Sequence, residues 1–161
     1  MTDQSRMSAQ WQVYLSGEIH SDWRDQIVQG AQSAGLPVQF SSPVTHHASS
    51  DDCGAAILGA ESNSFWHDHK GAKVNAIRTR TLIERADVVV VRFGDKFRQW
   101  NAAFDAGYAT ALGKSLITLH DPALTHALKE VDAAALAVAN GPPQVVRILD
   151  YVISGELRAA R

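Results

Sequence analysis

Short apolar runs and longer amphipathic segments alternate along the chain. The apolar runs predict five strands, at 11–16, 36–41, 87–93, 115–119 and 134–140. The unbroken valines of "DVVVVRF" are typical of a central parallel strand that is covered on both faces. The segments between the runs predict five helices, at 21–35, 71–86, 100–113, 122–131 and 142–157. The predicted core side of the second helix consists of Val74, Ile77, Leu82 and Ile83.

Strand and helix alternation of this kind is typical of a parallel sheet with helices on both faces. Five strands fit the doubly wound, flavodoxin-like (Rossmann-like) α/β fold with strand order 2-1-3-4-5. At 161 residues the chain suits one domain, which we expect to span 11–161. The first ten residues, "MTDQSRMSAQ", carry no such pattern and are expected to be frayed.

One segment interrupts the alternation. Residues 42–70 form an unusually long connection, because loops beyond about 15 residues are uncommon in a small domain. It contains Ile57, Phe65 and Trp66, so we expect it to be ordered, as a lid or as a contact between subunits.

Composition narrows the function classes. A hydrophobic fraction of 45% with 20% charged residues is typical of a globular protein, and a net charge of −2 argues against binding a nucleic-acid polymer. No apolar run approaches the roughly 20 residues that would span a membrane. Cys53 is the only cysteine, which fits a reducing cytoplasm.

The topology predicts where a ligand would bind. In a doubly wound sheet, ligands bind at the carboxyl ends of the strands where the strand order reverses, here between the first and third strands. The loops that follow those strands, "SGEIHSDWR" (16–24) and "GDKFRQWN" (94–101), are both polar. The chain has neither G-x-G-x-x-G nor a P-loop, so we expect no cofactor.

The first of these loops has features of an anion site. Gly17 allows a tight turn, and the start of the following helix offers free N–H groups. Arg24 lies in the first helical turn, where a partner anion would explain a positive charge. The alternative is a surface ion pair of Arg24 with Asp22 or Asp25.

Asp105 is the strongest candidate for chemistry. Asn101, Asp105 and Tyr108 share one face of their predicted helix. The neighbours of Asp105 are mostly alanines, and a carboxylate buried among them is costly unless it is paired or used. The alternative is an ordinary aspartate near a helix start, exposed to solvent.

The histidines support a weaker hypothesis. His46, His47, His67 and His69 could supply metal ligands, although their spacing matches no closed zinc motif. We therefore expect no metal, and Cys53 has no catalytic signature around it.

The segments "VYLSGEIH", "ADVVVVRFGD" and "WNAAFDAGYATALGKSLI" resemble the nucleoside 2-deoxyribosyltransferase superfamily, in its YtoQ-type branch. The resemblance covers nearly the whole chain and implies five parallel strands. It also implies breakage of an N-glycosidic bond by a carboxylate that falls on Asp105. The superfamily usually has glutamate there and an acid at the position of Gln99. Asp95 could replace that acid.

The resemblance suggests an enzyme, a deoxyribosyltransferase or an N-glycoside hydrolase, in which Asp105 attacks the anomeric carbon. Tyr14 and Tyr108 would position Asp105, while Asn101 and Asp95 would hold the sugar. Trp23 or Trp100 would stack on the base. The other candidates for contacts with a nucleoside or nucleotide, including any phosphate, are Ser16, Gly17, Glu18, His20, Arg24 and Gln99.

A second hypothesis is a non-catalytic protein that binds or senses a nucleotide or nucleotide derivative with the same pocket. The shorter acid at Asp105 and the glutamine at Gln99 motivate it. In both cases we expect a homo-oligomer, most simply a two-fold dimer, with the 42–70 segment over the Asp105 pocket of its own or the adjacent subunit.

Overall fold

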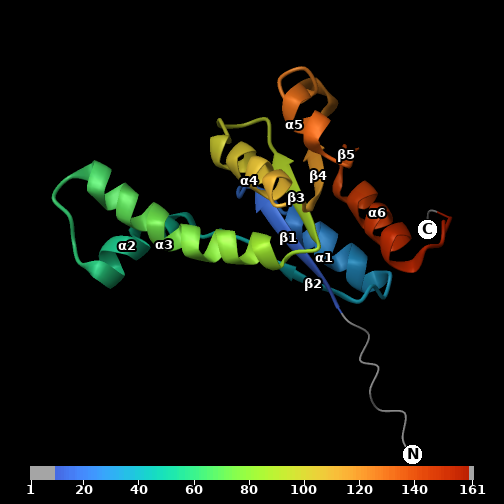
Figure 1. Cartoon of the computed structure of the whole chain (residues 1–161), viewed down its shortest axis with the longest axis horizontal. Helices are drawn as coiled ribbons and strands as arrows, with labels where there is room; N and C mark the ends of the chain where they lie inside the picture. The colour runs from blue at the N-terminus through green and yellow to red at the C-terminus, as the bar shows by residue number, and fades with distance from the viewer. Residues whose placement is uncertain (1–9, 160–161) are drawn as a thin grey trace, which may run out of the picture.

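Five parallel strands form one sheet at the centre of the structure, a computed structural model that describes residues 10–159 (Figure 1). The strands are β1 (Trp11–Gly17), β2 (Val38–Ser41), β3 (Val88–Phe93), β4 (Ser115–His120) and β5 (Ala137–Ala139). Their order is β2-β1-β3-β4-β5, which confirms the predicted fold. The expected frayed N-terminus lies outside the described residues except for its last residue, Gln10.

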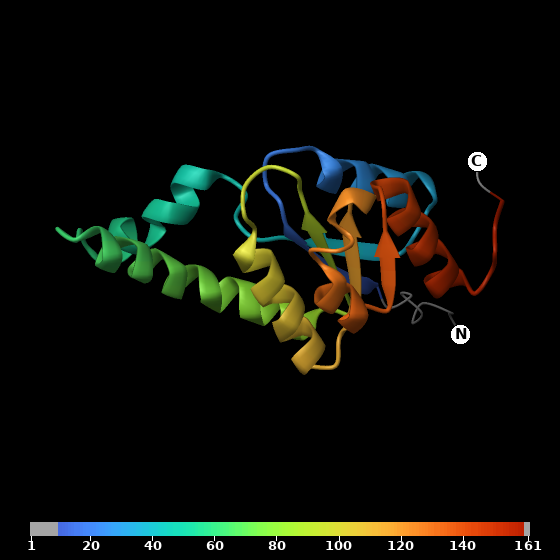
Figure 2. The same cartoon turned by 90° about the horizontal axis from the view of Figure 1, so that it is seen from above.

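Helices pack on both faces of the sheet (Figures 1 and 2). They are α1 (Trp23–Ser33), α2 (His47–Leu58), α3 (Ser64–Arg85), α4 (Trp100–Ala111), α5 (Lys129–Ala134) and α6 (Pro142–Ser154). Helices α1 and α6 cover one face, and α3 and α4 cover the other. None of the helices within 10–159 is long and apolar enough to cross a membrane.

Alternate residues of the strands supply two separate apolar cores, because successive side chains of a strand point to opposite faces. Val13 and Leu15 of β1 pack with α1 and α6 on one face. Tyr14 of β1 packs with Val89, Val91 and α4 on the other. The valines of β3 that are buried on both faces explain why its sequence shows no polar alternation.

The 42–70 segment is not a loop, and this corrects the expectation from sequence. It forms α2 and the beginning of α3, which together make a helical hairpin that extends away from the sheet (Figures 1 and 2). We call residues 47–77 the arm. On the arm, Phe65 is 63% exposed and Trp66 is 54% exposed, so neither closes over a pocket of its own chain.

Two glycines and two helix N-caps explain how the arm forms a helical hairpin. A Cβ atom on Gly54 would lie 2.4 Å from Gly71 N, so the two helices cross with their backbones in contact. The side chain of His46 accepts a hydrogen bond from Ser49 N, and that of Asn63 accepts one from Phe65 N. Side-chain caps of this kind are typical of helix starts.

Smaller differences follow from local packing. The helix expected over 122–131 is a 3-10 turn at Pro122–Leu124 followed by α5. The predicted second helix begins seven residues earlier than 71, at Ser64. Ile83 is buried as predicted. Ile77 is 71% exposed, because this part of α3 extends beyond the sheet.

Candidate active site

Asp105 lies on α4 and faces the end of β1. The Ser16 hydroxyl donates a hydrogen bond of 2.6 Å to Asp105 Oδ2. Ser16 is fully buried, whereas Asp105 is partly exposed. The carboxylate is therefore held against the strand end, at the sheet edge where the topology predicted a site. The Ser16 hydroxyl thus binds the Asp105 carboxylate in this structure.

The environment of Asp105 disfavours its charge. Burial raises the pKa of the Asp105 carboxyl, and the hydrogen bond from Ser16 partly opposes that rise. Oδ2 is the oxygen that accepts this bond. None of the groups in residues 10–159 donates a hydrogen bond to Oδ1, and this oxygen is accessible to solvent. One carboxylate oxygen is thus anchored while the other stays available.

Tyr14 is close enough to Asp105 for the charge of that carboxylate to act on it. Burial raises the pKa of Tyr14 to about 12, and the nearby charge of Asp105 adds to the rise, while the Thr79 hydroxyl acts against it. The Tyr14 hydroxyl is buried without a hydrogen bond of normal geometry. An unpaired buried hydroxyl is costly, so a phenol kept at this position indicates a task.

Arg24 makes contacts that neither interpretation of the sequence anticipated. Its guanidinium points inward and donates to three carbonyl oxygens, those of Leu15, Gly17 and Glu18. Burial lowers its pKa to about 10, with Tyr14 and Glu18 acting in the opposite direction. Arg24 therefore ties the first loop to α1, and three of its five N–H donors bind the protein's own backbone.

The first loop is built around close backbone approaches. Gly17 has φ +107°, and a Cβ atom there would lie 2.1 Å from Arg92 O, so the turn requires glycine for packing against β3. Glu18 is buried and accepts hydrogen bonds from His20 N and the Ser21 hydroxyl. These bonds outweigh burial and lower the pKa of the Glu18 carboxyl.

Three further candidates have structural contacts instead of the expected ones. Trp23 is only 2% exposed and packs in the core, so it cannot stack on a base. The Tyr108 hydroxyl donates to Glu84 of α3, not to Asp105. Gln99 accepts a hydrogen bond from Gly94 N and donates to Lys96 O, which fixes the loop before α4.

The remaining candidates lie at the surface of the same edge. Trp100 is 71% exposed, with the Arg98 guanidinium 5.7 Å from its ring. Asn101 is exposed in the first turn of α4. His20 is exposed on the first loop, and its ring meets that of Phe97 from the second loop at 4.8 Å. Sequence reasoning missed Phe97, whose only signal was an aromatic residue in a polar loop.

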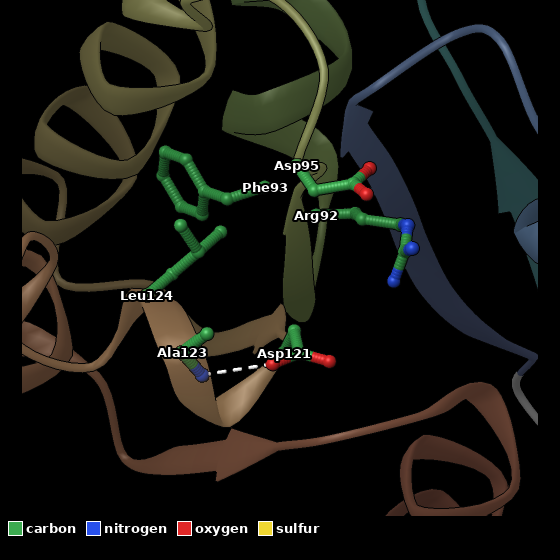
Figure 3. Close-up of a pocket in the computed structure, with 6 residues that line it drawn as sticks. All are labelled: Arg92, Phe93, Asp95, Asp121, Ala123 and Leu124. Carbon is green, nitrogen blue, oxygen red and sulfur yellow. Dashed lines mark hydrogen bonds between the residues drawn. The ribbon is translucent and has the colours of Figure 1, made fainter.

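A cavity of about 390 Å³ opens at the carboxyl ends of β3 and β4 (Figure 3). Its lining consists of Arg92, Phe93, Asp95, Asp121, Ala123 and Leu124. Asp95, predicted as a sugar contact, lies near the Arg92 side chain in this view. The lining is acidic overall, because two carboxylates accompany one guanidinium and Glu18 lies 3.6 Å from Arg92 Nε.

The arm histidines form pairs, not a cluster. His47 pairs with Asp51 at 3.2 Å and His67 with Asp52 at 3.1 Å. No group of three or more potential metal ligands gathers within residues 10–159. The metal hypothesis therefore lacks a ligand set in the described part of the chain.

Comparison with known proteins agrees with this architecture. The family model for nucleoside 2-deoxyribosyltransferase YtoQ matches residues 14–153. An uncharacterized protein, YtoQ of Bacillus subtilis (strain 168), is 40% identical over 144 residues, which cover 89% of this chain and 97% of that protein. A solved 2-deoxyribosyltransferase from Bacillus psychrosaccharolyticus superposes with a TM-score of 0.50 at 16% identity, covering 83% of this chain and 89% of that one.

The doubly wound parallel sheet defines a Rossmann-like α/β protein, with the same fold as that solved 2-deoxyribosyltransferase. Within that class, the match over 14–153 and the 40% identity single out one branch. The chain belongs to the YtoQ family of nucleoside 2-deoxyribosyltransferases.

Proposed function

We propose that the protein breaks the N-glycosidic bond of a nucleoside, with Asp105 as the nucleophile. The observation that carries this proposal is the contact between Ser16 and Asp105, which anchors Oδ2 at the strand end and leaves Oδ1 available. Membership of the YtoQ family supports the substrate class. The single cysteine supports a cytoplasmic setting.

The reaction proceeds in two steps that both use this carboxylate. Oδ1 of Asp105 bonds to the anomeric carbon as the carbon–nitrogen bond breaks, and the electron pair leaves with the base, which takes up a proton from solvent. The sugar of the resulting glycosyl ester then passes to water or to the nitrogen of a second base. That acceptor loses a proton to solvent as the ester bond breaks, which regenerates the carboxylate. A carboxylate nucleophile thereby divides one difficult step into two easier ones.

The charges around the edge favour a nucleoside over a nucleotide. Three of the five N–H donors of Arg24 are occupied by backbone carbonyls, and Arg92 lies beside Glu18. Asp95 and Asp121 line the neighbouring cavity and would repel a phosphate. Carboxylates instead suit sugar hydroxyls, so Asp95 is our candidate for holding the sugar, together with exposed Asn101 in the first turn of α4.

The test is base release from a panel of 2′-deoxynucleosides and ribonucleosides and their 5′-monophosphates, followed by chromatography. We expect release from nucleosides, with or without an added acceptor base, and loss of at least about 1,000-fold in Asp105→Ala, since the nucleophile is removed. Release that is undiminished in Asp105→Ala would contradict the proposal. Thermal stabilisation by nucleosides without any release would instead favour the binding protein.

A further inference from the structure

An aromatic contact joins the two loops that meet at the switch point of the sheet. The ring of Phe97, from the loop between β3 and α4, lies 4.8 Å from the ring of His20, from the loop between β1 and α1, at an angle of 47°. These loops adjoin the two halves of the candidate site, since β1 carries Ser16 and α4 carries Asp105. The contact therefore lies at the mouth of the site.

The backbone of Phe97 is unusual for its residue type. Phe97 has φ +62°, and it is the non-glycine residue with positive φ in the described part of the chain. A bulky side chain in this region is strained, whereas glycine would adopt it freely. Packing inside the protein does not compensate for this strain, because the Phe97 side chain is 71% exposed.

Other contacts hold the loop in this conformation. Gln99 bonds to both Gly94 N and Lys96 O, on either side of Asp95. A Cβ atom on Gly94 would lie 2.7 Å from Glu18 Cγ, so the two loops also approach closely at their bases. The phenyl ring is thus presented to solvent on a braced loop. Strain of this kind is typical of functional positions.

We infer that Phe97 and His20 form the platform on which the base of the nucleoside stacks while Asp105 meets the sugar. This inference rests on the proposed function. Every base has a π-face, and stacking on an aromatic side chain tolerates different bases. Purines, with their larger faces, should bind more tightly than pyrimidines on such a platform.

The other aromatic candidates fit this task less well. Trp23 is buried in the core. The ring of Trp100 already has the Arg98 guanidinium near it. Phe104 is 63% exposed and lies one helical turn beyond Trp100, and its ring contacts no other aromatic ring within residues 10–159. Phe97 is the aromatic residue whose ring meets the first loop.

Binding is measured apart from chemistry by titration calorimetry of the Asp105→Asn protein with 2′-deoxyadenosine and 2′-deoxycytidine. We expect Phe97→Ala and Phe97→Gly in this background to weaken 2′-deoxyadenosine binding by about tenfold or more, and Phe97→Trp to retain it. Phe104→Ala, the matched control that removes another exposed ring, should bind as its parent does. His20→Ala should weaken binding less than the Phe97 variants, because it removes only the supporting ring.

A purely structural role is excluded by stability measured in the same samples. Phe97→Gly relieves the backbone, so its melting temperature should equal or exceed that of its parent while its affinity falls. Unchanged affinity in both Phe97→Ala and Phe97→Gly would overturn the inference and leave the proposed function intact. A loss of affinity matched by lower melting temperatures would also overturn it. Absence of base release by the unmodified protein contradicts the proposed function alone, because the calorimetric comparison does not depend on turnover.

Discussion

The Ser16 hydroxyl donates to Asp105 Oδ2 at 2.6 Å and joins residues that are 89 positions apart in the sequence. This bond explains why a helix rich in alanine keeps a carboxylate. Ala102, Ala106 and Ala109 of α4 are buried against the sheet, and their small side chains bring the helix close to it. Asp105 is thereby brought within reach of the end of β1, where one serine anchors it.

Removal of this bond should shift the pH dependence of the reaction. In Ser16→Ala the Asp105 carboxyl loses the interaction that opposes the rise of its pKa, so the pKa rises further. The ionised nucleophile then forms only at higher pH, and the acid limb of the kcat/KM profile moves upward. At neutral pH we expect kcat/KM to fall on the order of tenfold, the cost of one charge-assisted hydrogen bond. Ser16→Thr keeps a hydroxyl and should retain the original limb, and an unmoved limb in Ser16→Ala would argue against this role.

Asp105 should also lower the free energy of unfolding of the protein. Its pKa is raised in the folded protein, so between its ordinary value of 3.8 and the folded value the native state holds a proton that the unfolded chain has lost. Stability therefore falls as pH rises through that window. Asp105→Asn removes this cost, and we expect it to gain about 1 kcal/mol at neutral pH, as is common for substitutions of strained functional groups.

Denaturant unfolding of Asp105→Asn and the unmodified protein over a pH series checks this. The difference in the free energy of unfolding should be largest at neutral pH and should vanish below 3.8, where both side chains are uncharged. A gain that is the same at every pH would show that charge burial is not its cause.

Arg24 should contribute to folding and not to anion binding. Its substitution by alanine removes the guanidinium that donates to three carbonyl oxygens at a partly buried position, so we expect Arg24→Ala to lose about 3 kcal/mol of unfolding free energy. Arg24→Lys should recover only part of this, because an ammonium group lacks the planar fork. Arg147→Ala, an exposed arginine of α6, is the control. Stabilisation of the native protein by inorganic phosphate that disappears in Arg24→Lys would restore the phosphate role.

The arm should mediate self-association. Ile57, Leu58, Phe65 and Trp66 are all more than half exposed on a hairpin whose buried α2 residue is a glycine. Such a hairpin is weakly stabilised by itself, so we propose that a second copy covers it in a two-fold dimer. Sedimentation at micromolar concentration should give a dimer, and Phe65→Ser with Trp66→Ser should shift it toward the monomer.

Leu157→Ser, which removes an exposed apolar residue near the C-terminus, should leave the dimer unchanged. A single species at 17.5 kDa for the unmodified protein would contradict the proposal. If the neighbouring arm also covers the site, the double arm variant should raise KM for nucleosides more than it changes kcat.

The strands and their order were predictable because each depends on local pattern and on general rules of chain connection. The valines of β3 and the runs at β1 and β4 needed no knowledge of their partners. Parallel connection of alternating strands and helices leaves few possible topologies, and the switch point follows from the topology. The sequence therefore predicted the edge of the sheet that carries Asp105.

The individual roles at that edge were decided by tertiary structure. Three predicted roles fitted the positions of their residues in the sequence: Arg24 as an anion receptor, Trp23 as a stacking ring and Gln99 as a substrate contact. In the fold, Arg24 is turned to carbonyl oxygens, Trp23 to the core and Gln99 to its own loop. The direction of a polar side chain depends on which groups lie unsatisfied around it, and those groups come from distant parts of the chain.

The sequence by itself determined the α/β class, the strand order and the meeting of the loops after β1 and β3, since hydrophobic periodicity and connection rules act locally. Tertiary structure decided that the two helices begun within 42–70 pair as a hairpin, because the Gly54 and Gly71 backbones come into contact there. It alone joined Ser16 to Asp105 and His20 to Phe97. Side chains far apart in sequence come together only once the sheet has placed their backbones, so no local sequence pattern predicts these two contacts.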